Sequence, residues 1–132
     1  MKILIAEDDP IIQKLNSRLM AVWGYDFDMV SNGSEAVNLA KKNKGNYDLC
    51  LMDIDMPVMN GLEATRIIRQ KVKYFPIMAL SGNPEYREKC LEIGIDYFMV
   101  KPFCLDNLFV KLNELVVKFY KFEIKCKDYF IT

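Results

Sequence analysis

Four short apolar runs in this sequence are each followed at once by side chains that could take part in phosphoryl chemistry. These side chains are the acids Glu7, Asp8 and Asp9, the acid Asp53, the hydroxyl group of Ser81 and the amine of Lys101. Carboxylates held close together repel one another, and a divalent cation is the usual remedy. Oxygen ligands suit Mg²⁺, or Mn²⁺, better than zinc. A cation, a lysine and a hydroxyl group could together hold a phosphoryl group, and Asp53 is the central candidate for a nucleophile that forms an aspartyl phosphate.

The elements that would position these side chains alternate between strands and helices. Apolar runs predict strands over residues 3–6, 27–30, 49–52, 77–80 and 97–100. Their length and continuity are typical of parallel strands covered on both faces. Apolar residues at helical spacing predict helices over residues 11–22, 36–40, 62–68, 84–93 and 105–119. We therefore expect one α/β domain, with a single doubly wound five-stranded parallel sheet, five helices and right-handed crossovers.

In such a sheet the carboxyl ends of the strands carry the ligand site. The acids after the first strand, Asp53 after the third, Ser81 after the fourth and Lys101 after the fifth should therefore converge on one rim. The chain contains no Gly-rich phosphate loop, so we do not expect this rim to cradle a nucleotide.

Composition excludes several classes of function. The 132 residues suit one domain, and 18 basic against 18 acidic residues give no net charge, which argues against direct nucleic-acid binding. The longest apolar run, residues 19–23, is far short of a membrane span, and no signal peptide is expected. The absence of histidine excludes a Ser-His-Asp triad and His-ligated zinc, so any phosphohistidine must lie on another molecule. The four cysteines lack metal spacing, which favours free thiols in a reducing cytosol.

Several motifs occur in the order typical of one signalling family. They are Glu7-Asp8, the segment 51–61 around Asp53, Ser81, and Lys101-Pro102-Phe103. With these motifs the sequence resembles the receiver domain of two-component response regulators, including the chemotaxis regulators. The resemblance implies a flavodoxin-like receiver fold with strand order 2-1-3-4-5. It assigns residues 1–121 to the receiver domain and leaves residues 122–132 as a C-terminal tail.

The resemblance also implies a phosphoacceptor and a cation site. Asp53 corresponds to the phosphoacceptor, which would also contact the metal. Asp8 corresponds to a direct metal ligand, and Glu7 to one that acts partly through water. The backbone carbonyl of Asp55 would complete the protein's share of the coordination.

A second group of positions corresponds to the switch of the family. Ser81 resembles the hydroxyl residue that moves onto the new phosphoryl group, and Lys101 resembles the lysine that pairs first with the acceptor and then with the phosphate. The bond between Lys101 and Pro102 is typically cis in the family. Phe98 stands at the position of the switch aromatic residue. Asp55 and Asn83 stand at the positions that tune the lifetime of the phosphorylated state.

Some of these residues also have purely structural interpretations. Asp9 followed by Pro10 is typical of a helix start. Phe98 could be an ordinary core residue, and Asp55 an ordinary surface acid. The aromatic residues and lysines from 119 to 132 could fold back on the domain or contact a partner, and two outward residues of the last helix, Val110 and Val117, would suit a docking face.

The resemblance implies a cytoplasmic, bacterial signalling protein that is not an enzyme. A histidine kinase or a histidine phosphotransfer protein would phosphorylate it, and an unknown output protein or a phosphorylation-dependent homodimer would respond on the face formed by the fourth helix, fifth strand and fifth helix. Residues 9–14 and 61–66 resemble those of receivers fused to hybrid histidine kinases, which would make this chain a receiver excised from such a kinase. Met1 just before the first strand instead favours a stand-alone protein.

Two other functions stay open. Asp53-Ile54-Asp55 also resembles the nucleophile motif of haloacid-dehalogenase-type phosphatases, although that motif normally ends the first strand. A degenerate receiver that binds its partner without phosphorylation is the other alternative.

Overall fold

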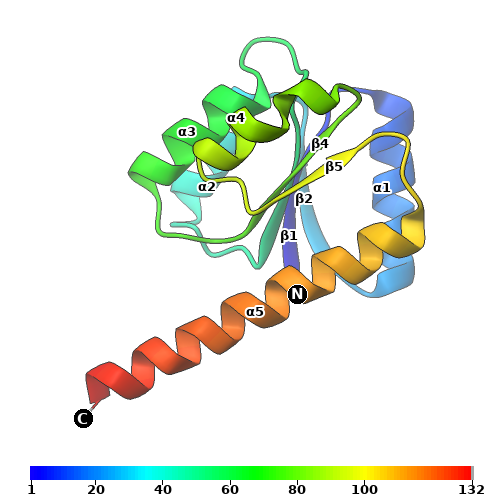
Figure 1. The fold of residues 1–132 in the computed structure, drawn as a ribbon. Helices are drawn as coiled ribbons and strands as arrows, with labels where there is room; N and C mark the ends of the chain where they lie inside the picture. Colours follow the sequence, from blue (N-terminus) through cyan, green and yellow to red (C-terminus); the bar gives the residue numbers. More distant parts are fainter. Residues whose placement is uncertain (132) are drawn as a thin grey trace.

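A computed structural model describes the backbone of residues 1–131 and the side chains of residues 1–125. Strands and helices alternate along the chain, as the sequence predicts (Figure 1). The elements are β1 (Lys2–Ala6), α1 (Pro10–Trp23), β2 (Asp26–Val30), α2 (Gly33–Lys42), β3 (Leu49–Asp53), α3 (Gly61–Lys71), β4 (Ile77–Ser81), a 3-10 turn (Pro84–Tyr86), α4 (Arg87–Glu92), β5 (Tyr97–Val100) and α5 (Leu105–Ile131). The predicted fourth helix over 84–93 is thus divided into a 3-10 turn and a shorter α-helix.

All neighbouring strands of the sheet are parallel, and their order is β2-β1-β3-β4-β5. This is the predicted doubly wound arrangement. In the strand register, Ala6 lies beside Met52, Asp53 beside Leu80 and Ser81 beside Val100. The carboxyl ends of β1, β3, β4 and β5 therefore meet at one edge, which is the edge where the sequence predicts the site.

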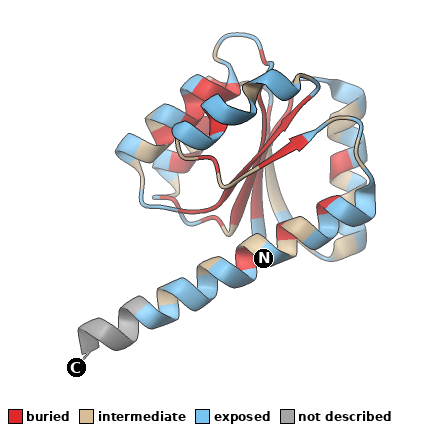
Figure 2. Ribbon diagram, in the orientation of Figure 1, coloured by how far each residue is buried: buried red, intermediate tan, exposed pale blue. Residues whose placement is uncertain are grey.

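Helices cover the sheet on both faces (Figure 1). Residues of α2, α3 and α4 pack into one apolar cluster with alternate strand residues such as Leu4, Cys50 and Met52. Residues of α1 and α5 form the other cluster with Ile5 and Leu51. Successive residues of a strand point to opposite faces, so each central strand contributes to both clusters. Figure 2 shows the result, with buried residues concentrated along the strands.

Local capping fixes where α1 begins and ends. The side chain of Asp9 accepts a hydrogen bond of 2.8 Å from the backbone N–H of Ile11, and Pro10 opens the helix. At the other end, Gly24 adopts a left-handed conformation with φ 75°. The structural interpretation of Asp9 as a helix cap is therefore confirmed.

Helix α5 is longer than its sequence pattern predicts. It continues without interruption through the predicted boundary at residue 121 and ends at Ile131. The helix passes the loops that precede β3 and β4, at the end of the sheet opposite the predicted site. There Phe119 packs on Tyr74 with ring centroids 5.6 Å apart, and the hydroxyl of Tyr120 donates a hydrogen bond to Asp48. Phe119 and Tyr120 thus contact their own domain from within the continuous helix. The predicted contacts of Tyr129 and Phe130 lie outside the described side chains.

Cys50, Cys90 and Cys104 are free thiols in the structure, and the side chain of Cys126 lies outside the described part. Among the described helices, none is both long enough and apolar enough to span a bilayer.

Candidate phosphoryl and metal site

Three carboxylates meet at the carboxyl edge of the sheet. Glu7 and Asp8 follow β1, and Asp53 ends β3. One oxygen atom from each of the three lies within 4.8 Å of the others. Glu7 and Asp53 are only 4% and 7% exposed, whereas Asp8 faces solvent. A buried cluster of this kind needs positive charge nearby, and its oxygen ligands, with one side open to water, fit Mg²⁺.

The burial of Glu7 changes its acidity. Desolvation raises the pKa of its carboxyl group from 4.5 to about 8, and the hydrogen bond with Asp53 and the charge of Asp53 act in the same direction. The ammonium group of Lys101 opposes this rise in pKa. Without a cation, Glu7 therefore holds its proton near neutral pH, and a bound cation would favour the ionised form.

Lys101 supplies the positive charge of the site. Its Nζ atom lies 3.4 Å from Oδ1 of Asp53 and 3.9 Å from Oε2 of Glu7. Its backbone N–H donates a 2.8 Å hydrogen bond to the carbonyl of Ser81, which ties the loop after β5 to the end of β4. The peptide bond between Lys101 and Pro102 is cis. The lysine thus lies next to Asp53, the carboxylate that the sequence predicts to be the phosphoacceptor.

Ser81 ends β4 and is buried. Its hydroxyl oxygen accepts a 3.1 Å hydrogen bond from the backbone N–H of Asn83. The side chain of Asn83 accepts in turn from the N–H of Glu85, so this residue caps the 3-10 turn before α4. Its predicted influence on the phosphoryl lifetime stays a prediction.

Phe98 is buried in the cluster between the sheet and α2, α3 and α4. It lies beside Ala79 in the strand register, two residues before Ser81. Because side chains two residues apart in a strand share a face, Phe98 and Ser81 are on the same face of the sheet. The core position of Phe98 is therefore observed, and its role as a switch stays a prediction.

The loop between β3 and α3 is held close to Asp53. The backbone N–H of Gly61 donates a 2.9 Å hydrogen bond to the carbonyl of Ile54, and a Cβ atom at Gly61 would overlap the carbonyl oxygen of Asp53. A glycine is needed at this close approach. Asp55 lies in the same loop with its side chain exposed, and its backbone carbonyl stays a predicted ligand.

Gln13 was not predicted as part of the site. Its side-chain amide donates a 2.6 Å hydrogen bond to the backbone carbonyl of Glu7 and a 3.2 Å hydrogen bond to the hydroxyl of Ser31. It thereby joins α1 to the acidic turn after β1. No sequence pattern marks this contact, because it joins segments that only the folded chain brings together.

The fold and the site together define a class: a doubly wound α/β protein whose acidic carboxyl edge is suited to a cation and a phosphoryl group. Residues 3–113 match the family described as "Response regulator receiver domain". The chain belongs to the response regulator receiver family.

Known relatives agree with this membership. Hybrid signal transduction histidine kinase B of Dictyostelium discoideum is 38% identical over 126 residues, which is 84% of this chain and 6% of that protein. The chain thus spans a small part of the length of this relative. Among solved structures, the receiver domain of sensor histidine kinase PA1611 from Pseudomonas aeruginosa is 34% identical with a TM-score of 0.79, covering 87% of this chain and 96% of that one. That structure has a magnesium ion coordinated in its active-site cleft.

A third similar structure contains a partner. It is the co-crystal structure of the histidine phosphotransfer protein Ypd1 with the receiver domain of its downstream response regulator Ssk1, from Saccharomyces cerevisiae. The receiver is 27% identical with a TM-score of 0.80, covering 89% of each chain. Because the relatives include an amoeba and a yeast protein, the expectation of a bacterial source is not supported by these comparisons.

Proposed function

We propose that Asp53 accepts a phosphoryl group from a phosphohistidine of a partner protein. The observation that carries this proposal is the position of Lys101 Nζ, 3.4 Å from Asp53 Oδ1, next to the cluster of Glu7, Asp8 and Asp53. A carboxylate oxygen of Asp53 would attack the phosphorus atom, the P–N bond would break, and the imidazole would leave with the bonding electron pair. The donor must be another molecule because this chain has no histidine.

The residues around Asp53 would bind the phosphoryl group in two ways, through a cation and through Lys101. Glu7, Asp8, Asp53 and the carbonyl of Asp55 would hold Mg²⁺, which neutralises charge on the phosphoryl oxygens when bound. Lys101 would neutralise the oxygens on the other side. Mn²⁺ prefers the same oxygen ligands and is included in the assay below.

The phosphorylated state would differ from the free state through Ser81, Lys101 and Phe98. Phosphorylation adds about −1.5 to −2 charges, and Ser81 and Lys101 would move onto the new oxygens. Phe98 shares a face with Ser81 and would change its packing with it. The neighbouring surface from α4, β5 and α5 has a shallow pocket lined by residues that include Arg87 and Lys111, which supports an output partner there.

The donor would dock beside α1. Ile11 and Leu15 of α1 are exposed, and Leu15 lines a pocket that also includes Phe103 and reaches Lys101. An exposed apolar surface next to a reactive group is suited to a protein donor. A histidine kinase or a histidine phosphotransfer protein would fit, whether the receiver acts alone or within a hybrid kinase. Free thiols support a reducing, cytoplasmic setting.

Family membership favours this function over the phosphatase alternative. We propose that the protein assists its own phosphorylation and dephosphorylation without acting on other substrates, with Asp55 and Asn83 tuning the lifetime. A receiver that works without phosphorylation is the alternative that the next experiment separates.

The test is intact-mass spectrometry after incubation with acetyl phosphate and Mg²⁺, Mn²⁺ or a chelator. We expect a cation-dependent gain of one phosphoryl group that is lost in Asp53→Asn and kept in Asp106→Asn, which changes an exposed acid on α5. Stoichiometric labelling of Asp53→Asn would contradict the assignment. An inert protein that also leaves acetyl phosphate intact would indicate the constitutive binding module.

A further inference from the structure

Helix α5 carries a second apolar stripe on the side that faces away from the domain. Its inward face buries Leu108 and Leu112, whereas Val110, Val117 and Ile124 are 51%, 52% and 59% exposed. These three residues are seven positions apart, so they lie two turns apart on one side of the helix. We call Val110, Val117 and Ile124 the α5 stripe. Exposed apolar side chains that line up along one side of a helix are suited to an interaction surface.

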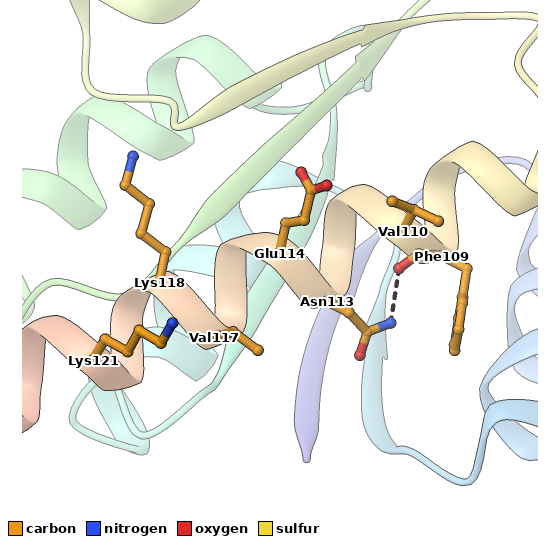
Figure 3. Close-up of a pocket in the computed structure, with 7 residues that line it drawn as sticks. All are labelled: Phe109, Val110, Asn113, Glu114, Val117, Lys118 and Lys121. Carbon is orange, nitrogen blue, oxygen red and sulfur yellow. Dashed lines mark hydrogen bonds between the residues drawn. The ribbon is translucent and has the colours of Figure 1, made fainter.

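An acidic and two basic side chains flank the α5 stripe. The shallow pocket on this face is lined by Phe109, Val110, Asn113, Glu114, Val117, Lys118 and Lys121. Figure 3 shows Glu114 and Lys118 extending from one side of the helix and Phe109 and Asn113 from the other. Glu114 lies three residues before Val117, and Lys121 lies four residues after it. The acid and the base are thus at nearly equal distances on either side of Val117.

We propose that the α5 stripe binds the same stripe of a second copy of this chain, with the two α5 helices antiparallel around a two-fold axis near Val117. In this arrangement Val117 meets its own counterpart, and Val110 meets Ile124 of the second copy. Glu114 comes opposite Lys121 of the second copy. A surface that complements itself in this way is suited to an isologous dimer.

The charges select the antiparallel arrangement. If the helices were parallel, each residue would face its own copy, so Glu114 would face Glu114 and Lys121 would face Lys121. Like charges across an interface are unfavourable. Among the side chains that the structure describes, Glu114 pairs with Lys111 of its own helix, at 3.3 Å on the surface, and an exposed pair of this kind is weak. Glu114 is therefore available for a second copy.

The size of the stripe sets the expected strength. Val110 to Ile124 extends about 21 Å along the helix, and one helix face against another buries less than the roughly 1,200 Å² of a standard interface. The dimer should be weak and reversible. It goes beyond the proposed function, because no residue of the α5 stripe lies at the phosphoryl site, and it should form without phosphorylation.

The test is sedimentation velocity of the unphosphorylated 132-residue chain over micromolar to millimolar concentrations. We expect concentration-dependent dimers, and Val117→Glu should weaken them at least about tenfold because two carboxylates would meet at the axis. The matched control is Val22→Glu, which changes an exposed valine on α1 and should leave dimerisation unchanged. A chain that stays monomeric, or a dimer that Val117→Glu does not weaken, would overturn the proposal.

A charge exchange tests the orientation. Glu114→Lys and Lys121→Glu should each weaken the dimer, because each places like charges opposite one another. The double variant should restore it, because the pairs are then reversed in sign. In a parallel dimer the single changes would only replace one like-charged pair with another. Failure of the double variant to recover would therefore overturn the antiparallel arrangement.

Discussion

Replacing Glu7 with glutamine should stabilise the metal-free protein. The pKa of Glu7 is about 8 in the folded state and 4.5 in its ordinary environment. Between these two pH values the folded protein keeps a proton that the unfolded chain has lost, so stability falls as the pH rises. At about 1.4 kcal/mol for each pH unit above 4.5, this loss reaches about 3 kcal/mol at pH 7. A glutamine amide is neutral like the protonated carboxyl group, and Glu7→Gln avoids the loss.

The assay is urea unfolding of both proteins in chelator at several pH values. The gap in unfolding free energy should approach about 3 kcal/mol at pH 7 and shrink towards zero near pH 4.5. Added Mg²⁺ should narrow the gap at pH 7, because a cation stabilises the ionised Glu7. Glu88→Gln, a change at an exposed acid of α4, is the control and should follow the wild type. Coinciding curves at pH 7 would refute the electrostatic argument.

Three further predictions concern the site and the core. Asp8→Ala should lower Mg²⁺ affinity at least about tenfold in a titration, whereas Asp106→Asn should not, and equal affinities would remove Asp8 from the site. Gly61→Ala should destabilise the fold by about 1–3 kcal/mol in urea unfolding, because its Cβ atom would overlap the carbonyl of Asp53; an unchanged midpoint would contradict this close packing. At pH 8, iodoacetamide should alkylate the exposed Cys104 in the native protein and spare Cys50, because burial raises the pKa of the Cys50 thiol to about 12. Labelling is followed by peptide mapping, and alkylation of Cys50 as early as Cys104 would contradict this prediction.

The position of the site could be predicted because strand ends are a local property of the sequence. Each apolar run ends at a polar residue, and a parallel sheet brings such ends to one edge. The places of Asp53 and Ser81 at the ends of β3 and β4 therefore follow from the runs before them. The sheet order 2-1-3-4-5 is different, since nothing in the residue pattern fixes it, and it came from the family resemblance.

Contacts between distant segments could not be predicted in this way. Gln13 reaches the backbone of Glu7 through a side-chain amide, which has no counterpart in the apolar periodicity. Arg69 is a second example: it donates hydrogen bonds to the carbonyls of Gly94 and Phe75 and to the carboxylate of Asp96. The helical pattern suggested an end for α5 near residue 119 because the apolar residues there change to a mixed run. Residues 122–131 contain no glycine or proline that would end the helix.

The length of α5 has a mechanical consequence. The helix begins at Leu105, four residues after Lys101, and its 27 residues make a rod about 40 Å long. Phe119 and Tyr120 contact Tyr74 and Asp48 at the amino ends of the strands, and these contacts can serve as a fulcrum. From these contacts the helix extends about 22 Å back to Leu105 and about 17 Å on to Ile131, so a tilt of roughly 5° would displace its two ends by about 2 Å and about 1.5 Å. The helix is therefore a lever that would carry a movement beside the phosphoryl site to its far end, in the opposite direction and at nearly the same size.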